Sequence, residues 1–229
     1  MRTLAIGDLH GCAAALDALM ARVAPRPEDL IVMLGDYVDR GPDSAGVMNR
    51  LVKLSKDRRL VALRGNHEEM MTDARESPAQ LELWRSCGGD VALRSYAVLD
   101  DEGNLADVPD DHWDFLDHFC RDYYETVTHV FVHGGVYPNV PLSEQPGLIL
   151  RWEFFNDPPP HESGRIVVCG HTTQPEGRPR NIGHAVCIDT GAHKRGGWLT
   201  CLEAESGRIY QANQIGETRE SWVDEYLVE

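Results

Sequence analysis

The sequence predicts an α/β protein in which parallel strands alternate with helices. In the first third of the chain, apolar runs of strand length at Thr3–Ile6, Leu30–Leu34 and Leu60–Leu63 alternate with stretches of helical spacing. This β-α-β-α-β order favours parallel strands joined by right-handed crossovers. After residue 128 the chain returns to short apolar runs, which indicates further strands.

Helical spacing of apolar residues defines the connections between the first strands. Ala13–Val23 carries apolar residues three and four positions apart on one face, which predicts an amphipathic helix. Val47–Leu54 is the next predicted helix, and a third is expected after Asn66.

The middle of the chain, residues 77–128, has a different pattern. It is acidic, has helical spacing around Asp110–Phe119, and is interrupted by Gly88, Gly89 and Pro109. Because Gly and Pro break regular elements, we expect short helices here rather than a continuation of the sheet. Residues 77–128 are therefore predicted to form a helical insert or cap.

The second half of the chain predicts five more strands: Val130–Val132, Ile166–Cys169, Val186–Ile188, Leu199–Glu203 and Arg208–Ala212. Glu205-Ser206-Gly207 between the last two is typical of a hairpin turn. The acidic residues 217–229 are expected to form a surface tail or an edge helix. Together these elements predict a single domain over residues 1–229.

Composition and charge exclude several classes of protein. The chain of 229 residues is 42% hydrophobic and 26% charged, as in soluble globular proteins. A net charge of −15 repels nucleic acid and anionic lipid, so neither is an expected partner. No apolar stretch reaches the roughly 18 residues of a membrane span, and the first apolar run is too short for a signal peptide. We therefore expect a cytoplasmic protein; the oligomeric state is left open.

The six cysteines point away from disulfide or thiol chemistry. They are scattered without a CxxC pair in a long chain, so reduced and mostly buried thiols are expected. None is followed six positions later by Arg, which excludes the phosphate-binding loop of cysteine phosphatases.

Five short polar motifs each follow a predicted strand. They are Gly7-Asp8-Leu9-His10-Gly11, Gly35-Asp36-Tyr37-Val38-Asp39-Arg40-Gly41, Arg64-Gly65-Asn66-His67-Glu68, His133-Gly134-Gly135 and Gly170-His171-Thr172. In α/β sheets, ligands bind beyond the carboxyl ends of the strands. Five strands that end in Asp, Asn or His beside Gly therefore predict one shared pocket.

The residue types in these motifs indicate a metal site. Asp and His without Cys suit Mn²⁺, Fe, Zn²⁺ or Co rather than a structural zinc cage. Asp8 and His10 are two positions apart, so they project to the same side of a strand end. Asp36 and Asn66 follow at intervals of about one βαβ unit, which predicts that adjacent strands present them side by side.

The motif series GDLHG, GDYVDRG, RGNHE, HGG and GHT resembles the calcineurin-like metallophosphoesterases. It is most similar to the branch that contains the serine/threonine protein phosphatases and the small bacterial and phage phosphatases. The motifs extend from Asp8 to His171, and Ile188-Asp189-Thr190-Gly191 fits the same pattern. The resemblance implies a four-layer αββα sandwich, with two mixed β-sheets flanked by helices and a small helical insert.

The resemblance also implies a pair of metal ions. Asp8, His10 and Asp36 would bind the first ion; Asp36 would bridge to the second, which Asn66, His133 and His171 would complete. Mn²⁺ is the favoured cation, with Fe or Zn²⁺ as alternatives. Two divalent cations against two carboxylates reverse the local potential, so an anionic phosphate is attracted despite the negative chain. This hypothesis requires Asn66 and His171 to meet at one ion.

Further roles carry over from the resemblance. Arg40 and Asn66 would bind the substrate phosphate. The guanidinium of Arg40 suits this role because it donates two parallel hydrogen bonds to an oxyanion. Arg151 is a second candidate, although the family's Trp is displaced in this segment. His67 would be the general acid for the leaving alkoxide, and Asp39 would orient it and raise its pKa.

The implied activity is a dinuclear-metal-dependent phosphomonoesterase. It would hydrolyse phosphoprotein, at Ser/Thr and Tyr side chains, and small phosphate esters, by direct attack of a hydroxide that bridges the metals. A bis(5'-nucleosyl)-tetraphosphatase is the alternative within the same family. A nuclease would need a basic groove. A catalytically silent scaffold would be expected to lack ligand or acid residues, and here every motif position is filled.

Simpler explanations exist for several of these residues. Asp8 and Asp36 could be helix N-caps, and Arg64 is expected to support its loop rather than touch substrate. The remaining histidines are expected to be solvated (His112 and His118), in loops (His161 and His193) or structural (His129). His184 is either a loop residue or a neighbour of the site.

Overall fold

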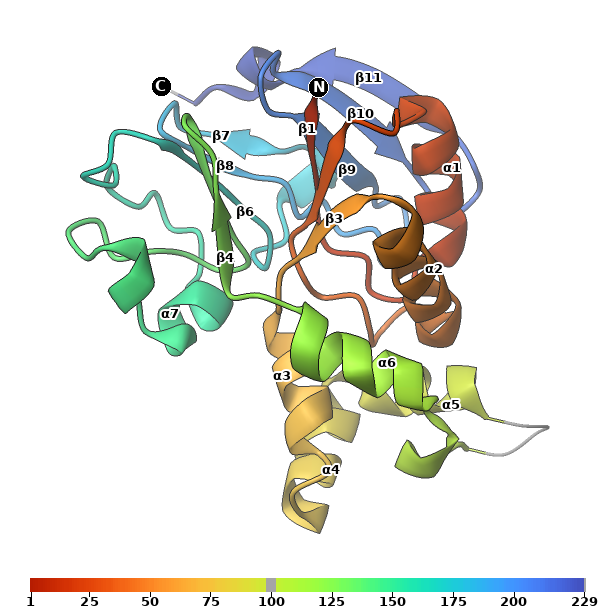
Figure 1. Cartoon of the computed structure of the whole chain (residues 1–229). Helices are drawn as coiled ribbons and strands as arrows, with labels where there is room; N and C mark the ends of the chain where they lie inside the picture. Colours follow the sequence, from red (N-terminus) through yellow and green to blue (C-terminus); the bar gives the residue numbers. More distant parts are fainter. Residues whose placement is uncertain (98–101, 229) are drawn as a thin grey trace.

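The computed structural model describes residues 1–97 and 102–228, in which two mixed β-sheets lie face to face between helical layers (Figure 1). The predicted α/β class and four-layer arrangement are confirmed. Residues 98–101 of the predicted helical segment, and residue 229, lie outside the described residues.

The first sheet has six strands in the order β11-β10-β9-β1-β2-β3. β1 and β2 are parallel, as are β2 and β3, whereas β9 runs antiparallel to β1. β10 and β11 continue the antiparallel half. The bounds are β1 Thr3–Ile6, β2 Leu30–Met33, β3 Arg59–Ala62, β9 Leu199–Glu203, β10 Arg208–Ala212 and β11 Thr218–Trp222.

The second sheet has five strands in the order β4-β5-β6-β8-β7, with the central three parallel. The bounds are β4 Tyr123–Glu125, β5 His129–Val132, β6 Ile166–Cys169, β7 Arg180–Asn181 and β8 Ala185–Cys187. The edge strands β4 and β7 were not predicted. They have three and two residues, too short for a recognisable period of two, and they form by pairing with β5 and β8.

The helices are α1 Ala13–Val23, α2 Ser44–Asp57, α3 Asn66–Asp73, α4 Pro78–Trp84, α5 Asp90–Tyr96, α6 Asp110–Asp114 and α7 Gly147–Trp152. α4 to α6, with a kink at Gly88 between α4 and α5 and a π-helical turn at Phe115–Phe119, form most of the helical segment predicted over residues 77–128. Figure 1 shows it projecting below the sheets. Short 3-10 helices lie at Leu105–Asp107, Leu142–Glu144 and Val223–Tyr226, and Pro175–Gly177 is a turn in which Glu176 has positive φ.

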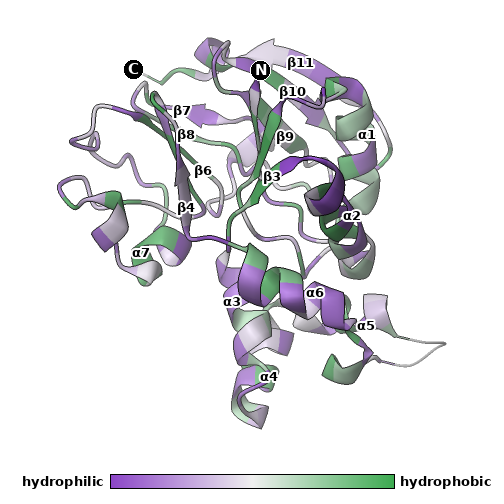
Figure 2. Ribbon diagram, in the orientation of Figure 1, coloured by the Kyte–Doolittle hydropathy of each residue, from purple (hydrophilic) through white to green (hydrophobic). Residues whose placement is uncertain are grey.

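Side chains along the central strands point alternately to the two faces of each sheet, and this alternation separates the layers. In β1, Leu4 and Ile6 pack toward the helices, whereas Ala5 faces the second sheet. In β5, Phe131 faces the first sheet and Val130 packs toward the α7 side. Both faces of these strands are buried, which is why their sequences are continuously apolar. Figure 2 shows hydrophobic residues among the strands at the centre of the molecule and mixed faces on α1 and α2.

The expectation of an acidic tail or edge helix over residues 217–229 is wrong. Thr218–Trp222 forms the edge strand β11, paired antiparallel with β10 from Ala212↔Thr218 to Arg208↔Trp222. The acidic Glu220 is accommodated there because it forms an ion pair with Arg208. The hairpin predicted between β9 and β10 is confirmed.

The expectation that His112 is solvated is also wrong. It is fully buried in the helical segment, where its ring contacts the hydroxyl of Tyr96 and the side-chain oxygen of Asn49 at 3.1 and 3.2 Å. A polar side chain with two partners can be buried without an unsatisfied group. His161 and His129 are buried too, while His118 is exposed as expected.

Among the described residues, no helix is both long enough and apolar enough to span a membrane.

Asp29 ties the start of the chain to the first sheet. Its carboxylate accepts hydrogen bonds from the backbone N–H of Arg2 at 2.8 Å, of Arg26 at 2.9 Å, and from the Arg2 guanidinium at 2.6 Å. Burial raises the pKa of Asp29, but Arg2 and these N–H donors lower it further, to about 2.

Asp29→Asn is predicted to lower the free energy of unfolding by about 2 kcal/mol at neutral pH. Because the folded-state pKa is depressed, this stabilisation is present above the unfolded value near 4 and is lost as pH falls toward 2. Urea unfolding at pH 7 and pH 3 measures both effects, and the difference between variant and parent should shrink at pH 3. The control is Asp17→Asn at the exposed Asp17–Arg50 pair, where a change of less than about 1 kcal/mol is expected.

Candidate functional site

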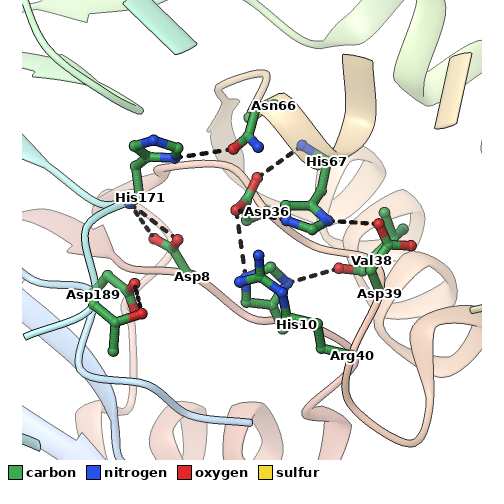
Figure 3. Close-up of polar contacts among 12 residues, drawn as sticks. Asp8, His10, Asp36, Val38, Asp39, Arg40, Asn66, His67, His171 and Asp189 are labelled. Carbon is green, nitrogen blue, oxygen red and sulfur yellow. Dashed lines mark hydrogen bonds and ion pairs between the residues drawn. The ribbon is translucent and has the colours of Figure 1, made fainter. Parts of the chain in front are cut away.

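The five polar motifs come together at the carboxyl ends of β1, β2, β3, β5 and β6. Figure 3 shows side chains from the loops after β1, β2, β3 and β6 directed into one space. The two sheets place their parallel strands with these ends together, so the motifs from distant parts of the sequence meet. The shared pocket predicted from the sequence is therefore present.

The loops that carry these side chains have unusual backbone. His10, Asp36, Asp39 and His171 all have positive φ, between 40° and 73°. Such a conformation is strained for residues with a Cβ and is concentrated at functional sites. Close approach of the loops also needs glycine, since a Cβ at Gly170 would lie 2.1 Å from Oδ1 of Asp8.

Asp36 is at the centre of the cluster. Nε2 of His10 lies 3.4 Å from one of its carboxylate oxygens, and Nε2 of His133 lies 3.3 Å from the other. Burial raises the pKa of Asp36, but the surrounding histidines, His133 and His67 foremost, hold it well below its usual range. Burial lowers the pKa of His10 and His133, so their neutral forms are favoured.

Backbone carbonyls set the tautomer of both rings. Nδ1 of His10 donates to the carbonyl of Val38 at 2.9 Å, and Nδ1 of His133 donates to that of Leu34 at 2.8 Å. With the proton on Nδ1, each Nε2 presents a lone pair to the cluster. This arrangement leaves Nε2 of each ring able to bind a metal ion.

Asn66, which follows β3 of the first sheet, contacts two histidines that follow strands of the second sheet. Its side-chain oxygen lies 3.0 Å from Nδ1 of His171 and 3.1 Å from Nε2 of His133. The required convergence of Asn66 and His171 is therefore observed. The pKa of His171 is lowered to about 4, because the ring is buried and lies next to His133.

Asp8 approaches the cluster from β1. Its carboxylate accepts the backbone N–H of His171 at 3.0 Å, and burial with the negative charges of Asp189 and Asp36 raises its pKa. Asp189 follows β8, accepts the N–H of Gly191 and the Thr173 hydroxyl, and its own pKa is raised by burial. Three carboxylates packed this closely repel one another unless cations neutralise them.

His67 and Asp39 form a buried pair next to Asp36. Nδ1 of His67 lies 2.6 Å from Oδ2 of Asp39, which also accepts Nε1–H of Trp84 at 2.9 Å. Burial lowers the pKa of His67, but Asp36 and Asp39 raise it further, so the net shift is upward. Nε2 of His67 is buried and makes no hydrogen bond within the described part of the chain.

Glu68 binds the loops themselves. This fully buried carboxylate accepts the backbone N–H of Asp36 at 2.8 Å, of Tyr37 at 2.7 Å and of Gly65 at 2.9 Å. It fixes the turn after β2 against the start of α3. Burial and the negative charge of Asp36 raise the pKa of Glu68 to about 7.

Beside the cluster is an open cavity of about 890 Å³. Arg40 and Lys194 are the cations that line it in the described part of the chain, and NH1 of Arg40 lies 2.8 Å from Nε2 of His10. Leu83, Trp152 and Phe154 contribute apolar surface to its walls. The cavity therefore offers positive charge next to the cluster and apolar walls farther out.

Arg151 lies elsewhere. Its guanidinium pairs with Glu69 and Asp122 at 2.6 Å, and it does not line the cavity, so the expected phosphate-binding role gains no support. Arg64 donates to the carbonyl of Leu116 at 2.6 Å and thereby supports its loop, as expected. His184 contacts the carbonyl of Pro158.

Several residues at the site could not be assigned a role from the sequence. His193, expected to be a loop residue, stacks edge-on against His10 with ring centroids 4.7 Å apart. No sequence motif singles out Trp84, and Glu68 lies in the Arg64–Glu68 motif without an expected role. Asp189, in the Ile-Asp-Thr-Gly sequence, had the strongest available signal, since a lone acid after a predicted strand matches the other motifs.

The donor atoms fit divalent cations. Ligand atoms of His10, Asp36 and His67, and those of Asp36, His133 and His171, lie within 4.8 Å of one another in each group. Asp8 falls outside both groups. Oriented imidazole lone pairs, a shared carboxylate, and the carboxylates of Asp8 and Asp189 provide the borderline-to-hard set that such ions prefer. Asp36, common to both groups, is in the position of a bridging ligand.

Comparison with known proteins agrees with this site. Residues 1–193 match the calcineurin-like phosphoesterase family. The chain belongs to the calcineurin-like phosphoesterases.

Relatives carry two different activities in their names. Serine/threonine-protein phosphatase 1 of Salmonella typhimurium is 43% identical over 90 residues, which is 39% of this chain and 39% of that protein. The symmetrical bis(5'-nucleosyl)-tetraphosphatase of Janthinobacterium sp. is 34% identical over 145 residues, 60% of this chain and 45% of that protein. The matches thus span less than half the length of either relative.

A solved structure shares the fold. A protein described as a candidate diadenosine tetraphosphatase superposes with a TM-score of 0.63 at 20% identity, over 96% of this chain and 93% of that one. At this identity the likeness concerns the arrangement of the sheets and helices.

Glu68→Gln is predicted to destabilise the site loops, because an amide has one acceptor oxygen where the carboxylate offers two to backbone donors. The expected loss is roughly 2–3 kcal/mol of unfolding free energy. The Tm measured by thermal unfolding and the amount of Mn²⁺ bound per chain should both fall. The matched control is Glu76→Gln, an exposed position beyond α3; equal losses in both variants would contradict the role given to Glu68.

Proposed function

We propose that this chain is a metal-dependent phosphomonoesterase that acts on phosphorylated protein side chains and on small phosphate esters. The observation that carries the proposal is the cavity in which Arg40 and Lys194 lie beside the cluster of Asp and His donors. Two cations match one phosphate group better than a chain of four phosphates. The open, partly apolar walls suit the side chain and backbone of a peptide.

Asp8, His10, Asp36, Asn66, His133 and His171 would hold two divalent cations, with Mn²⁺ the first candidate. When bound, such cations polarise phosphoryl oxygens and lower the pKa of water, which supplies a nucleophile near neutral pH. The protein orients the ligands through backbone hydrogen bonds and shields the cluster from bulk water.

Arg40 would grip the substrate phosphate. Its guanidinium is at the border between the donor cluster and the cavity, and its fork can donate two parallel hydrogen bonds to phosphate oxygens. This contact would hold the phosphorus atom over the cluster and leave the ester group toward Trp152 and Phe154.

His67 would protonate the leaving oxygen. Asp39 and Asp36 raise its pKa, which keeps the proton on the ring near neutral pH. Asp39 binds Nδ1, so the proton available for transfer is on Nε2, which makes no hydrogen bond to the residues that the structure describes. A proton donor in this position fits an alkoxide leaving group, which cannot depart unprotonated.

Tetraphosphatase activity is the second candidate. It is favoured by the ring of Phe154, which is 67% exposed and tilted against His171 with centroids 5.0 Å apart. An exposed aromatic face beside a phosphate site could stack on a nucleobase. The name of the Janthinobacterium relative supports the same activity.

A substrate panel separates the two candidates. The chain is freed of metal with a chelator, reloaded with Mn²⁺ and assayed on p-nitrophenyl phosphate, on phosphoserine, phosphothreonine and phosphotyrosine peptides, and on diadenosine tetraphosphate. The proposal expects phosphate release from the monoesters and none before reloading. Cleavage of the dinucleotide with kcat/KM orders of magnitude above that of the peptides would favour the tetraphosphatase.

Replacing His67 with Asn should affect substrates unequally. A serine alkoxide needs protonation, whereas nitrophenolate leaves readily without it. Phosphoserine peptide hydrolysis should therefore fall by about 10²–10⁴ and p-nitrophenyl phosphate hydrolysis by much less. The measurement is kcat for both substrates with the Mn²⁺ content checked. Asp39→Asn should show a milder form of the same inequality, and equal losses on both substrates would rule out proton donation by His67.

A further inference from the structure

Glu69, the residue after the Arg64–Glu68 motif, makes the main side-chain link between α3 and α7. Oε1 of its carboxylate accepts Nε and NH2 of Arg151 at 2.9 and 2.6 Å. Oε2 accepts Nε1–H of Trp152 at 2.5 Å. One carboxylate thus holds two consecutive side chains at the end of α7.

These contacts are shielded from solvent. The side chain of Glu69 is 25% exposed and that of Arg151 is 15% exposed, so this pair is better protected than the surface ion pairs of the protein. Charge-assisted hydrogen bonds of this kind are about twice as strong as neutral ones. Arg151 is held a second time by Asp122, at 2.6 Å, and that carboxylate is half exposed.

α7 depends on such external contacts for its position. It has six residues, and an isolated helix of that length is unstable in water. On one side, the carbonyls of Leu150 and Ile149 accept the N–H groups of Gly134 and Gly135, next to the site residue His133. On the other side, Glu69 holds the last turn. Figure 1 shows α7 and the start of α3 at the same end of the sheets.

The residue held by Glu69 is part of the cavity. Trp152 lines it together with Phe154, and Met70, the next residue after Glu69, lines it from α3. The indole of Trp152 is partly buried against the main hydrophobic core, and a side chain packed on one side can still rotate about its side-chain bonds. The hydrogen bond at Nε1 removes that freedom.

From these contacts we propose that Glu69 is a positioning residue for the substrate cavity, which fixes Trp152 as a wall against the organic group of a phosphate ester. The proposal rests on the proposed phosphoesterase function for the identity of the ligand. It also gives Arg151 a role: the guanidinium secures Glu69 and α7 instead of binding the phosphate.

Two ligands that the enzyme does not hydrolyse distinguish binding of the organic group by Trp152 from binding of the phosphate group. Phenylphosphonate presents an aromatic group to the wall, whereas inorganic phosphate lacks one. Binding of each to the Mn²⁺-loaded protein is measured by calorimetry. In the parent chain phenylphosphonate should bind more tightly than phosphate, and Glu69→Ala should reduce that advantage by about three- to tenfold while leaving phosphate affinity unchanged.

Two further variants exclude a general loss of structure. Trp152→Phe keeps an aromatic ring and deletes the Nε1–H donor, so it should reduce the phenylphosphonate advantage without unfolding the chain. Combined with Glu69→Ala, its effect should be less than additive, since both variants remove the same hydrogen bond. Asp122→Asn, which removes only the outer contact to Arg151, should leave the advantage intact.

Kinetics give a second readout. For p-nitrophenyl phosphate, Glu69→Ala should raise KM with little change in kcat, because a wall that binds ground state and transition state alike acts on KM. The inference is overturned if the parent shows no preference for phenylphosphonate, or if Glu69→Ala leaves that preference unchanged. A parent chain that binds the probes as expected but hydrolyses no monoester refutes the proposed function while the role of Glu69 stands.

Discussion

The site depends on one buried carboxylate that is not itself a candidate ligand. Glu68 accepts backbone N–H groups from the turn after β2 and from the turn after β3. Those two turns carry Asp36 and Asn66, so a single side chain holds in register the residues that link the two groups of donor atoms. Removing the Glu68 carboxylate from water is costly. The backbone donors offset part of that cost, and burial with the charge of Asp36 still raises the pKa of Glu68 to about 7.

The same design recurs around the cluster: backbone and neighbouring side chains constrain each functional group before any ligand arrives. Carbonyl groups select the tautomers of His10 and His133, and Trp84 and Asp39 orient His67. The price is strain, visible as left-handed backbone at several functional residues. Close packing of Asp8, Asp36 and Asp189 adds repulsion that bound cations would relieve, which couples the stability of the loops to metal binding.

The helical segment between β3 and β4 serves the site as well as the core. Trp84 at the end of α4 donates to Asp39, and Arg64 reaches the carbonyl of Leu116 in the turn after α6. On the opposite side, α7 is too short to hold itself and is anchored by Glu69 and by the Gly134–Gly135 turn. Sequence differences in these two segments would therefore alter the cavity walls without touching the donor cluster.

The amino-acid sequence by itself determined the α/β class, most strands and helices, and the meeting of five motifs, because apolar periodicity and strand-end motifs are local signals. α1, β9 and β10 have the bounds predicted for them. The edge strands β4, β7 and β11 were decided by tertiary pairing, since short or acidic segments become strands only beside a partner. Likewise Arg151 and His193 meet partners far away in sequence, and Glu68 accepts hydrogen bonds from Asp36 and Tyr37 more than 30 residues earlier. No local pattern specifies these long-range partners, because they are decided only when the elements pack.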